Sequence, residues 1–201
     1  MILSELEAVI ASRAVSGSLW QLISDKFPLN HQIAYQDTSA TRHRMYLLEE
    51  KGQQYIVRAE PALEALPGVD SLRERVILDA ISSFDWAPNL MINEPQQGVL
   101  IMHHAGKCLE ELSSIQRSNL TQALIEMQSV KDLPELDYAK LFQQYRDEMR
   151  DSGHLQLIDE TEQQLNSLPE LPKVLVHHDL HPGNVCWQNE SPTIIDWEYA
   201  G

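Results

Sequence analysis

The chain has 201 residues, enough to bury a core as one domain or as two small lobes. Apolar residues make up 43% and charged residues 22%, as is ordinary for a soluble globular protein. The formal net charge of −15 disfavours binding to nucleic acid or to an anionic membrane surface, so we expect neither as a partner. A nucleotide could bind only at a local positive site helped by a divalent ion.

No apolar run reaches the roughly 18 residues that a membrane helix needs. The first thirteen residues lack the order of a signal peptide, and their apolar positions fit one face of a helix. Cys108 and Cys186 have no CxxC spacing. These features predict a cytoplasmic protein with reduced, partly buried thiols.

The front of the chain, from about residue 32 to 59, has the pattern of β structure. Residues 43–50 and 53–58 flank Lys51-Gly52, which predicts a hairpin. A proline-rich loop follows, and then helical periodicity from Ser71, which we expect to cap the helix with Glu74 in a capping-box spacing. Residues 99–102 predict a buried strand that leads into a hinge at 103–106.

The back of the chain is mainly helical. Apolar periodicity predicts helices within 109–127, 138–149 and 155–168, and short strands at 174–177 and 193–196. We therefore predict a two-lobed α+β fold, with a β-rich N-lobe over 1–103 and a mainly helical C-lobe over 104–201.

The segment HHDLHPGN, residues 177–184, allows two kinds of site. In the first, His177, His178, His181 and Asp179 bind a metal ion, as in a metallohydrolase. This alternative is the weaker one, because adjacent residues on an extended strand point to opposite faces. The remaining histidines also supply no second pair at metal-binding spacing.

In the second, the segment is a loop that holds a carboxylate and an amide. Asp179 and Asn184 flank the turn-forming Pro182-Gly183, and the pair Ile194-Ile195 leads to Asp196. Phosphoryl transfer needs such a set: one carboxylate that orients the acceptor hydroxyl, and an Asn and an Asp that hold magnesium on the phosphates.

With HHDLHPGN and the later IIDWEYAG, the chain resembles the aminoglycoside phosphotransferase and choline kinase family, which has a protein-kinase-like fold. It is most similar to the thiamine kinase and bacterial choline kinase branches. The resemblance implies an ATP- and Mg²⁺-dependent kinase in which Asp179 is catalytic and Asn184 and Asp196 bind the metal. It also implies a small-molecule hydroxyl substrate, such as a cationic amine alcohol; an aminoglycoside or sugar acceptor and a catalytically silent nucleotide-binding protein remain alternatives.

The same resemblance implies nucleotide-binding residues in the N-terminal half. Arg58 ends a strand and is expected to contact the α- and β-phosphates, with Glu74 as its ion-pair partner. The backbone of Met102, His103, His104 and Ala105 is expected to meet the adenine.

Five more side chains have expected roles near the loop. His177 and His181 would support it through hydrogen bonds, and Glu198 would lie near the metal or the substrate amine. Trp197 and Tyr199 would stack on a cationic substrate or pack in the core.

Two departures from the family pattern stand out. Residues 37–41 lack the glycines of a phosphate-binding loop, and the chain stops at Gly201, where relatives continue into helices. We therefore expect a C-lobe that is truncated.

Overall fold

The computed structural model describes residues 33–35, 44–50, 52–59, 66–169 and 172–201. The expected N-terminal helix and the 37–41 loop lie outside these residues. Within the described ranges, no helix combines the length and the apolar character that crossing a bilayer requires.

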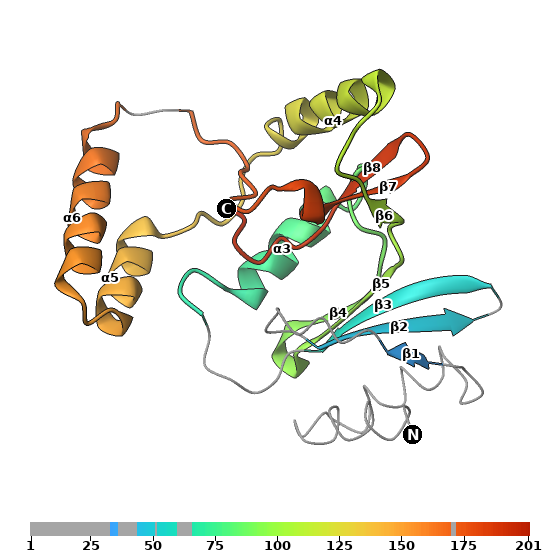
Figure 1. Cartoon of the computed structure of the whole chain (residues 1–201), viewed down its shortest axis with the longest axis horizontal. Coiled ribbons are helices and arrows are strands. Elements are labelled where there is room, and N and C mark those ends of the chain that lie inside the picture. Colours follow the sequence, from blue (N-terminus) through green and yellow to red (C-terminus); the bar gives the residue numbers. More distant parts are fainter. Residues whose placement is uncertain (1–32, 36–43, 51, 60–65, 170–171) are drawn as a thin grey trace.

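The front of the chain forms an antiparallel five-stranded sheet in the order β1-β2-β3-β5-β4 (Figure 1). The strands are β1 Ile33–Tyr35, β2 Arg44–Glu50, β3 Gln53–Ala59, β4 Leu90–Glu94 and β5 Val99–His103. The predicted hairpin is confirmed, and Gly52 supplies its left-handed residue at φ +80°. Strand β4 was not predicted, because LMINE is a short segment without clear alternation.

Helix α3, Ser71–Ile81, is confirmed, but its predicted cap is wrong. Asp70 is the N-cap, and its carboxylate accepts hydrogen bonds of 3.0 Å from the backbone N–H groups of Leu72 and Arg73. An ionised carboxylate one residue earlier is a stronger acceptor for these groups than the Ser71 hydroxyl. Glu74 is thus not a capping residue, and its side chain is buried instead.

The three predicted helical regions are present as α4 Ser114–Met127, α5 Tyr138–Glu148 and α6 Ser152–Ser167. Helix α4 begins later than expected, because Ser113 and Gln116 form a capping box there. Helices α5 and α6 lie together to one side of the remaining elements (Figure 1). Arg146 of α5 joins them through ion pairs with Asp159 and Glu162.

A second, three-stranded sheet has the order β6-β7-β8, formed by β6 Lys107–Cys108, β7 Val185–Gln188 and β8 Ser191–Ile194. The strand expected at 174–177 is wrong, since only Val176 pairs there, with Gly201 through two bonds of 3.1 Å. The strand expected at 193–196 is shifted, and β8 ends before Asp196. Short 3₁₀ turns occupy Pro95–Gln97 and Pro182–Asn184.

One apolar cluster connects α3, β5, α4 and the C-terminal segment. Its members are Ile77, Leu78, Ile81, Trp86, Leu100, Met102, Ala123, Met127, Leu175, Ile194, Trp197 and Ala200. Because the cluster takes residues from both halves of the chain, the division at residue 103 stays a prediction. The cluster packs beneath the segments that carry Asn184 and Asp196.

Candidate active site

The β7–β8 hairpin brings Asn184 and Asp196 to the same end. Asn184 directly precedes β7, and Asp196 follows β8 by two residues. Val185 and Ile194 are register partners, and the Ile195 N–H donates to the Asn184 carbonyl at 2.9 Å. The two residues that the sequence predicted as metal ligands therefore lie at the open end of one hairpin. Asp196 has a left-handed backbone at φ +66°, a conformation that costs an aspartate energy and is often found at functional sites.

Asp179 is joined to this end of the hairpin through Asn184. The Asn184 amide nitrogen donates to the Asp179 backbone carbonyl at 2.9 Å and to its carboxylate Oδ2 at 3.2 Å. Since the amide nitrogen faces Asp179, the amide oxygen is the atom of Asn184 that is free to coordinate a metal ion. The Asp179 side chain is 46% exposed, so a solvent-borne molecule can reach its carboxylate.

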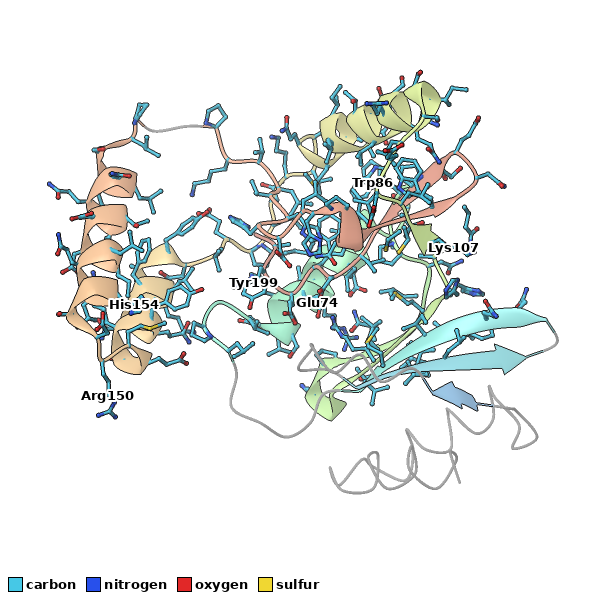
Figure 2. All side chains as sticks on the ribbon, in the orientation of Figure 1. Glu74, Trp86, Lys107, Arg150, His154 and Tyr199 are labelled. Carbon is cyan, nitrogen blue, oxygen red and sulfur yellow. The ribbon has the colours of Figure 1, made fainter. Side chains whose placement is uncertain are left out.

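Arg58 and Glu74 form a buried ion pair. Both terminal nitrogens of Arg58 donate to the two carboxylate oxygens of Glu74, one of them at 2.9 Å. The Arg58 Nη1 atom also lies 3.8 Å from Oδ1 of Asp196. The structure thus brings the predicted cation, its predicted partner and one predicted metal ligand together. Figure 2 labels Glu74 on α3.

A cavity of about 290 Å³ connects these groups. Its polar lining comes from Arg58, Glu74, Asn184 and Asp196. The apolar lining comes from Met45, Leu78, Pro88, Leu90, Leu100, Met102, Ile195 and Trp197. An apolar chamber with cationic and anionic groups at one side suits a flat, apolar ring that carries an anionic tail.

Only Met102 of the four expected hinge residues lines this cavity. His103, His104 and Ala105 line a separate, more polar cavity together with Gln54, Asn89 and Gln188. The backbone N–H groups of His103 and His104 already donate to the carbonyls of Asn89 and Gln54, each at 2.9 Å. Their adenine-binding role stays a prediction, and it would need these bonds to be exchanged.

His177 and His181 support the loop by hydrogen bonds, as expected. His177 is buried beside Trp197, and its Nε2 lies 2.9 Å from the carbonyl of Ile195. A carbonyl can only accept, so Nε2 carries the proton, and burial lowers the pKa of His177 below its usual value. His181 accepts from the Gly183 N–H at 3.0 Å and caps the 3₁₀ turn that ends at Asn184.

His178 connects the loop to α5. It has a left-handed backbone at φ +63°, its Nδ1 lies 3.1 Å from the Val176 carbonyl, and its Nε2 lies 2.6 Å from the Tyr138 hydroxyl. Because Nδ1 must donate to the carbonyl, Nε2 accepts from Tyr138 while the ring is neutral. Burial lowers the pKa of His178 and raises that of Tyr138, which favours this arrangement.

The aromatic residues after Asp196 have different surroundings. Trp197 is buried, and its indole N–H donates to the Ile194 carbonyl at 2.8 Å, so it packs in the core. It also lines the cavity described above, and stacking on a substrate stays a prediction. Tyr199 lies between α3 and α5 in the view of Figure 2, and it is partly exposed. Glu198 is partly exposed, and its carbonyl accepts from Arg73 at 3.3 Å.

Two residues were missed by the sequence analysis. Arg73 of α3 donates to the carbonyls of Gly68, Glu198 and Ala200, and so holds the segment after Asp196 against the helix. Tyr138 anchors His178. No local signal could have found either, because each acts on a segment far away in the sequence.

The donor set decides between the two kinds of metal site. Among the described residues, no three His, Cys, Asp or Glu side chains gather as a metal centre. His177, His178 and His181 each bond to a different partner, so they do not form the histidine site of a metallohydrolase. An amide oxygen and a carboxylate in the lining of one cavity instead suit Mg²⁺, which binds one or two protein oxygens, phosphates and water.

The family model described as "Phosphotransferase enzyme family" matches residues 85–201. The chain belongs to this family. The match begins before β4 and includes Asp179, Asn184 and Asp196, so the predicted family is confirmed. Among curated protein sequences, none matches the chain.

Solved structures of other phosphotransferases are similar in fold. Choline kinase LicA from Streptococcus pneumoniae is 17% identical, with a TM-score of 0.66, over 92% of this chain and 70% of that one. A choline/ethanolamine kinase family protein from Mesorhizobium loti is 14% identical, with a TM-score of 0.65, over 98% of this chain and 65% of that one. Spectinomycin phosphotransferase APH(9)-Ia, solved with ADP and spectinomycin, is 15% identical, with a TM-score of 0.53, over 91% of this chain and 68% of that one.

These phosphotransferases share the two-lobed, kinase-like α+β fold, which confirms the predicted fold class. The chain spans about two thirds of their length.

Proposed function

We propose that the chain transfers the γ-phosphoryl group of ATP to a hydroxyl group of a small molecule. One observation carries this proposal. Asn184 and Asp196 line the same cavity as Arg58, and Asp179 is hydrogen-bonded to Asn184 at its edge. The family membership gives the reaction class, and the ADP in the spectinomycin phosphotransferase structure supports a nucleotide donor.

The apolar lining of the cavity would hold the adenine, with Met102 and Leu100 among its contacts. Arg58 would bind the α- and β-phosphates, and Glu74 fixes its guanidinium in place. A guanidinium can bond two phosphate oxygens at once, which makes arginine suitable for this position.

Asn184 and Asp196 would hold magnesium through the amide oxygen and the carboxylate. A bound magnesium ion would neutralise charge on the phosphates as the phosphoryl group moves. Asn184 has an additional role that needs no metal: its amide nitrogen holds the Asp179 carboxylate in one orientation.

Asp179 would accept a hydrogen bond from the acceptor hydroxyl and align its oxygen with the γ-phosphorus. The oxygen forms the new P–O bond as the bond to ADP breaks, and the proton of the hydroxyl passes to the Asp179 carboxylate. The catalytic contribution is mainly positioning and charge stabilisation.

The acceptor would be a small amine alcohol of the choline or thiamine kind. The net charge of −15 favours a cationic substrate, and two similar structures are choline kinases or their relatives. The proposed location is the cytoplasm, where ATP would be available as the donor. Aminoglycosides and sugars are the competing acceptors, and a phosphorylation screen over the three classes would separate them.

The test uses Asp179→Asn, which keeps the size of the side chain and removes its charge. The rate of phosphoryl transfer from ATP to the best acceptor should fall by about 10³-fold or more. This is the size of the rate contribution expected from a well-positioned general base. The affinity for ATP with magnesium, measured by calorimetry, should change less than about threefold, because Asp179 contacts the acceptor rather than the nucleotide. Unchanged turnover in this variant would refute the assigned role.

A further inference from the structure

Cys108 and Cys186 are opposed across two neighbouring strands. They are register partners in the β6–β7 pair, and their Sγ atoms lie 3.5 Å apart. Directly opposed residues in an antiparallel pair have Cα atoms about 4.5 or 5.5 Å apart. Both separations fall within the roughly 4.4–6.8 Å that a disulfide spans. The two sulfurs can therefore bond after side-chain rotation, with the strand pairing retained.

The two thiols differ in access to solvent. Cys108 is exposed and Cys186 is buried, and the chain has no other cysteine. A dissolved oxidant therefore meets Cys108 first, and Cys186 is placed to react with the product.

The pair also contacts the loop that carries Asn184. The Cys108 thiol donates to the Gly183 carbonyl at 3.0 Å, and Gly183 lines the cavity beside Asn184. Directly before β6, the backbone of Gly106 lies against β7, since a Cβ on Gly106 would lie 2.1 Å from the Trp187 carbonyl oxygen. A chemical change at Cys108 is thus transmitted to the turn before Asn184.

We propose that Cys108 and Cys186 form an oxidation site, at which a peroxide converts the two thiols to a disulfide that weakens nucleotide binding in the adjacent cavity. The second half of this proposal rests on the proposed function. The disulfide removes the Cys108 thiol hydrogen, so the Gly183 carbonyl loses its donor. The loss of one such bond corresponds to an affinity change on the order of fivefold.

The chemistry balances with hydrogen peroxide as the oxidant. The Cys108 sulfur attacks one peroxide oxygen, the O–O bond breaks, and the products are a sulfenic acid and water. The Cys186 sulfur then attacks the sulfenic sulfur, the S–O bond breaks, and a second water leaves with the Cys186 proton. Two thiols lose two electrons and two protons, and one peroxide becomes two waters.

The disulfide is tested on the full chain with hydrogen peroxide, followed by denaturation, iodoacetamide labelling and intact-mass measurement. We expect a monomer that has lost two hydrogens and takes up no label, and a reducing agent should restore both thiols. The variants Cys108→Ser and Cys186→Ala each keep one cysteine thiol, so neither should form an internal disulfide. A wild-type protein that keeps both thiols, forms disulfide-linked dimers, or stops at oxidised Cys108 would overturn the proposal.

The effect on binding is tested by calorimetry with ATP and magnesium chloride. Oxidised wild type should bind on the order of fivefold more weakly than the reduced protein. Cys108→Ala, which lacks the donor, should bind as weakly without oxidant, whereas Cys108→Ser keeps a donor and should bind normally before and after peroxide. Equal affinities for the oxidised and reduced wild type would overturn this half.

The two proposals can fail separately. If the reduced protein binds no nucleotide, the proposed function and the affinity effect both fail, and the thiol count still decides whether the disulfide forms.

Discussion

Arg58 lies between two carboxylates that are far apart in the sequence, those of Glu74 and Asp196. Its terminal nitrogens bond to Glu74 of α3, and its Nη1 atom lies 3.8 Å from Oδ1 of Asp196. The second distance is too long for a hydrogen bond, so Glu74 fixes the guanidinium while Asp196 only contributes charge. Because the Asp196 side chain is 38% exposed, its carboxylate stays accessible from the cavity.

The Arg58–Glu74 pair should matter for stability as well as for binding. Glu74 is 3% exposed and Arg58 is 8% exposed, so Glu74→Gln leaves a buried, partly uncompensated cation. Such a change costs about 3–5 kcal/mol of the free energy of unfolding. Arg58→Met should cost a similar amount, and urea unfolding followed by tryptophan fluorescence measures both.

The matched control is the double variant Arg58→Met with Glu74→Met. It removes both charges together, so it should be less destabilised than the sum of the two single variants. Additive costs would show that the two side chains are energetically independent, contrary to the bonded geometry.

Magnesium should be needed for nucleotide binding through Asp196. In a thermal-denaturation assay, ATP with magnesium should raise the Tm, and EDTA should remove most of this rise. Asp196→Asn weakens the metal ligand and should reduce the magnesium-dependent part of the shift. Glu190→Gln is the control: Glu190 is exposed in the turn at the other end of the β7–β8 hairpin from Asn184 and Asp196, so a shift equal to that of wild type is expected. A magnesium-dependent shift that survives in Asp196→Asn would count against its role as a ligand.

The local geometry of the candidate catalytic loop could be predicted from the sequence, because spacing and turn chemistry determine it. Pro182-Gly183 forms a 3₁₀ turn, and the β7–β8 hairpin then brings Asn184 and Asp196 together. The ion pair of Arg58 with Glu74 was predicted from the family resemblance, and the structure contains it.

The errors came from long-range contacts and from competing local groups. Residues 174–177 have strand-like composition, but among the described residues the backbone of Val176 pairs only with Gly201, which lies far ahead in the sequence. Asp70 displaced Ser71 as the cap because it is the stronger acceptor. The roles of Arg73 and Tyr138 depend on packing between elements, which no local pattern records.

Stability should fall with acidification below neutral pH because of His177. Burial lowers its pKa in the folded protein, so between that value and the unfolded value of about 6.5 the unfolded state binds more protons. The stabilisation is fully present above about pH 6.5 and is lost as the pH falls, by at most about 1.4 kcal/mol per pH unit for one proton.

Urea midpoints at several pH values between 7.5 and 5.5 measure this slope. His177→Gln keeps an amide that can donate to Ile195 and has no titratable ring, so its slope should be shallower than that of wild type. The pKa of His178 is also lowered by burial, so His178 adds to the slope of stability against pH in both wild type and His177→Gln. Identical slopes would mean that His177 takes up no additional proton on unfolding.

The left-handed backbone of His178 gives the last prediction. A non-glycine residue at φ +63° is strained by about 1–2 kcal/mol, and its bonds to Val176 and Tyr138 offset that cost. His178→Ala keeps the strain and loses both bonds. His178→Gly loses the same bonds but removes the strain, so it should be more stable than His178→Ala by about 1 kcal/mol.

Tyr138→Phe isolates the bond to α5. It removes only the hydroxyl and should lower the free energy of unfolding by about 1 kcal/mol, because a single hydrogen bond is lost. If His178→Gly proved less stable than His178→Ala, the backbone at this position would not be strained, and the loop before Asp179 would be held by other contacts.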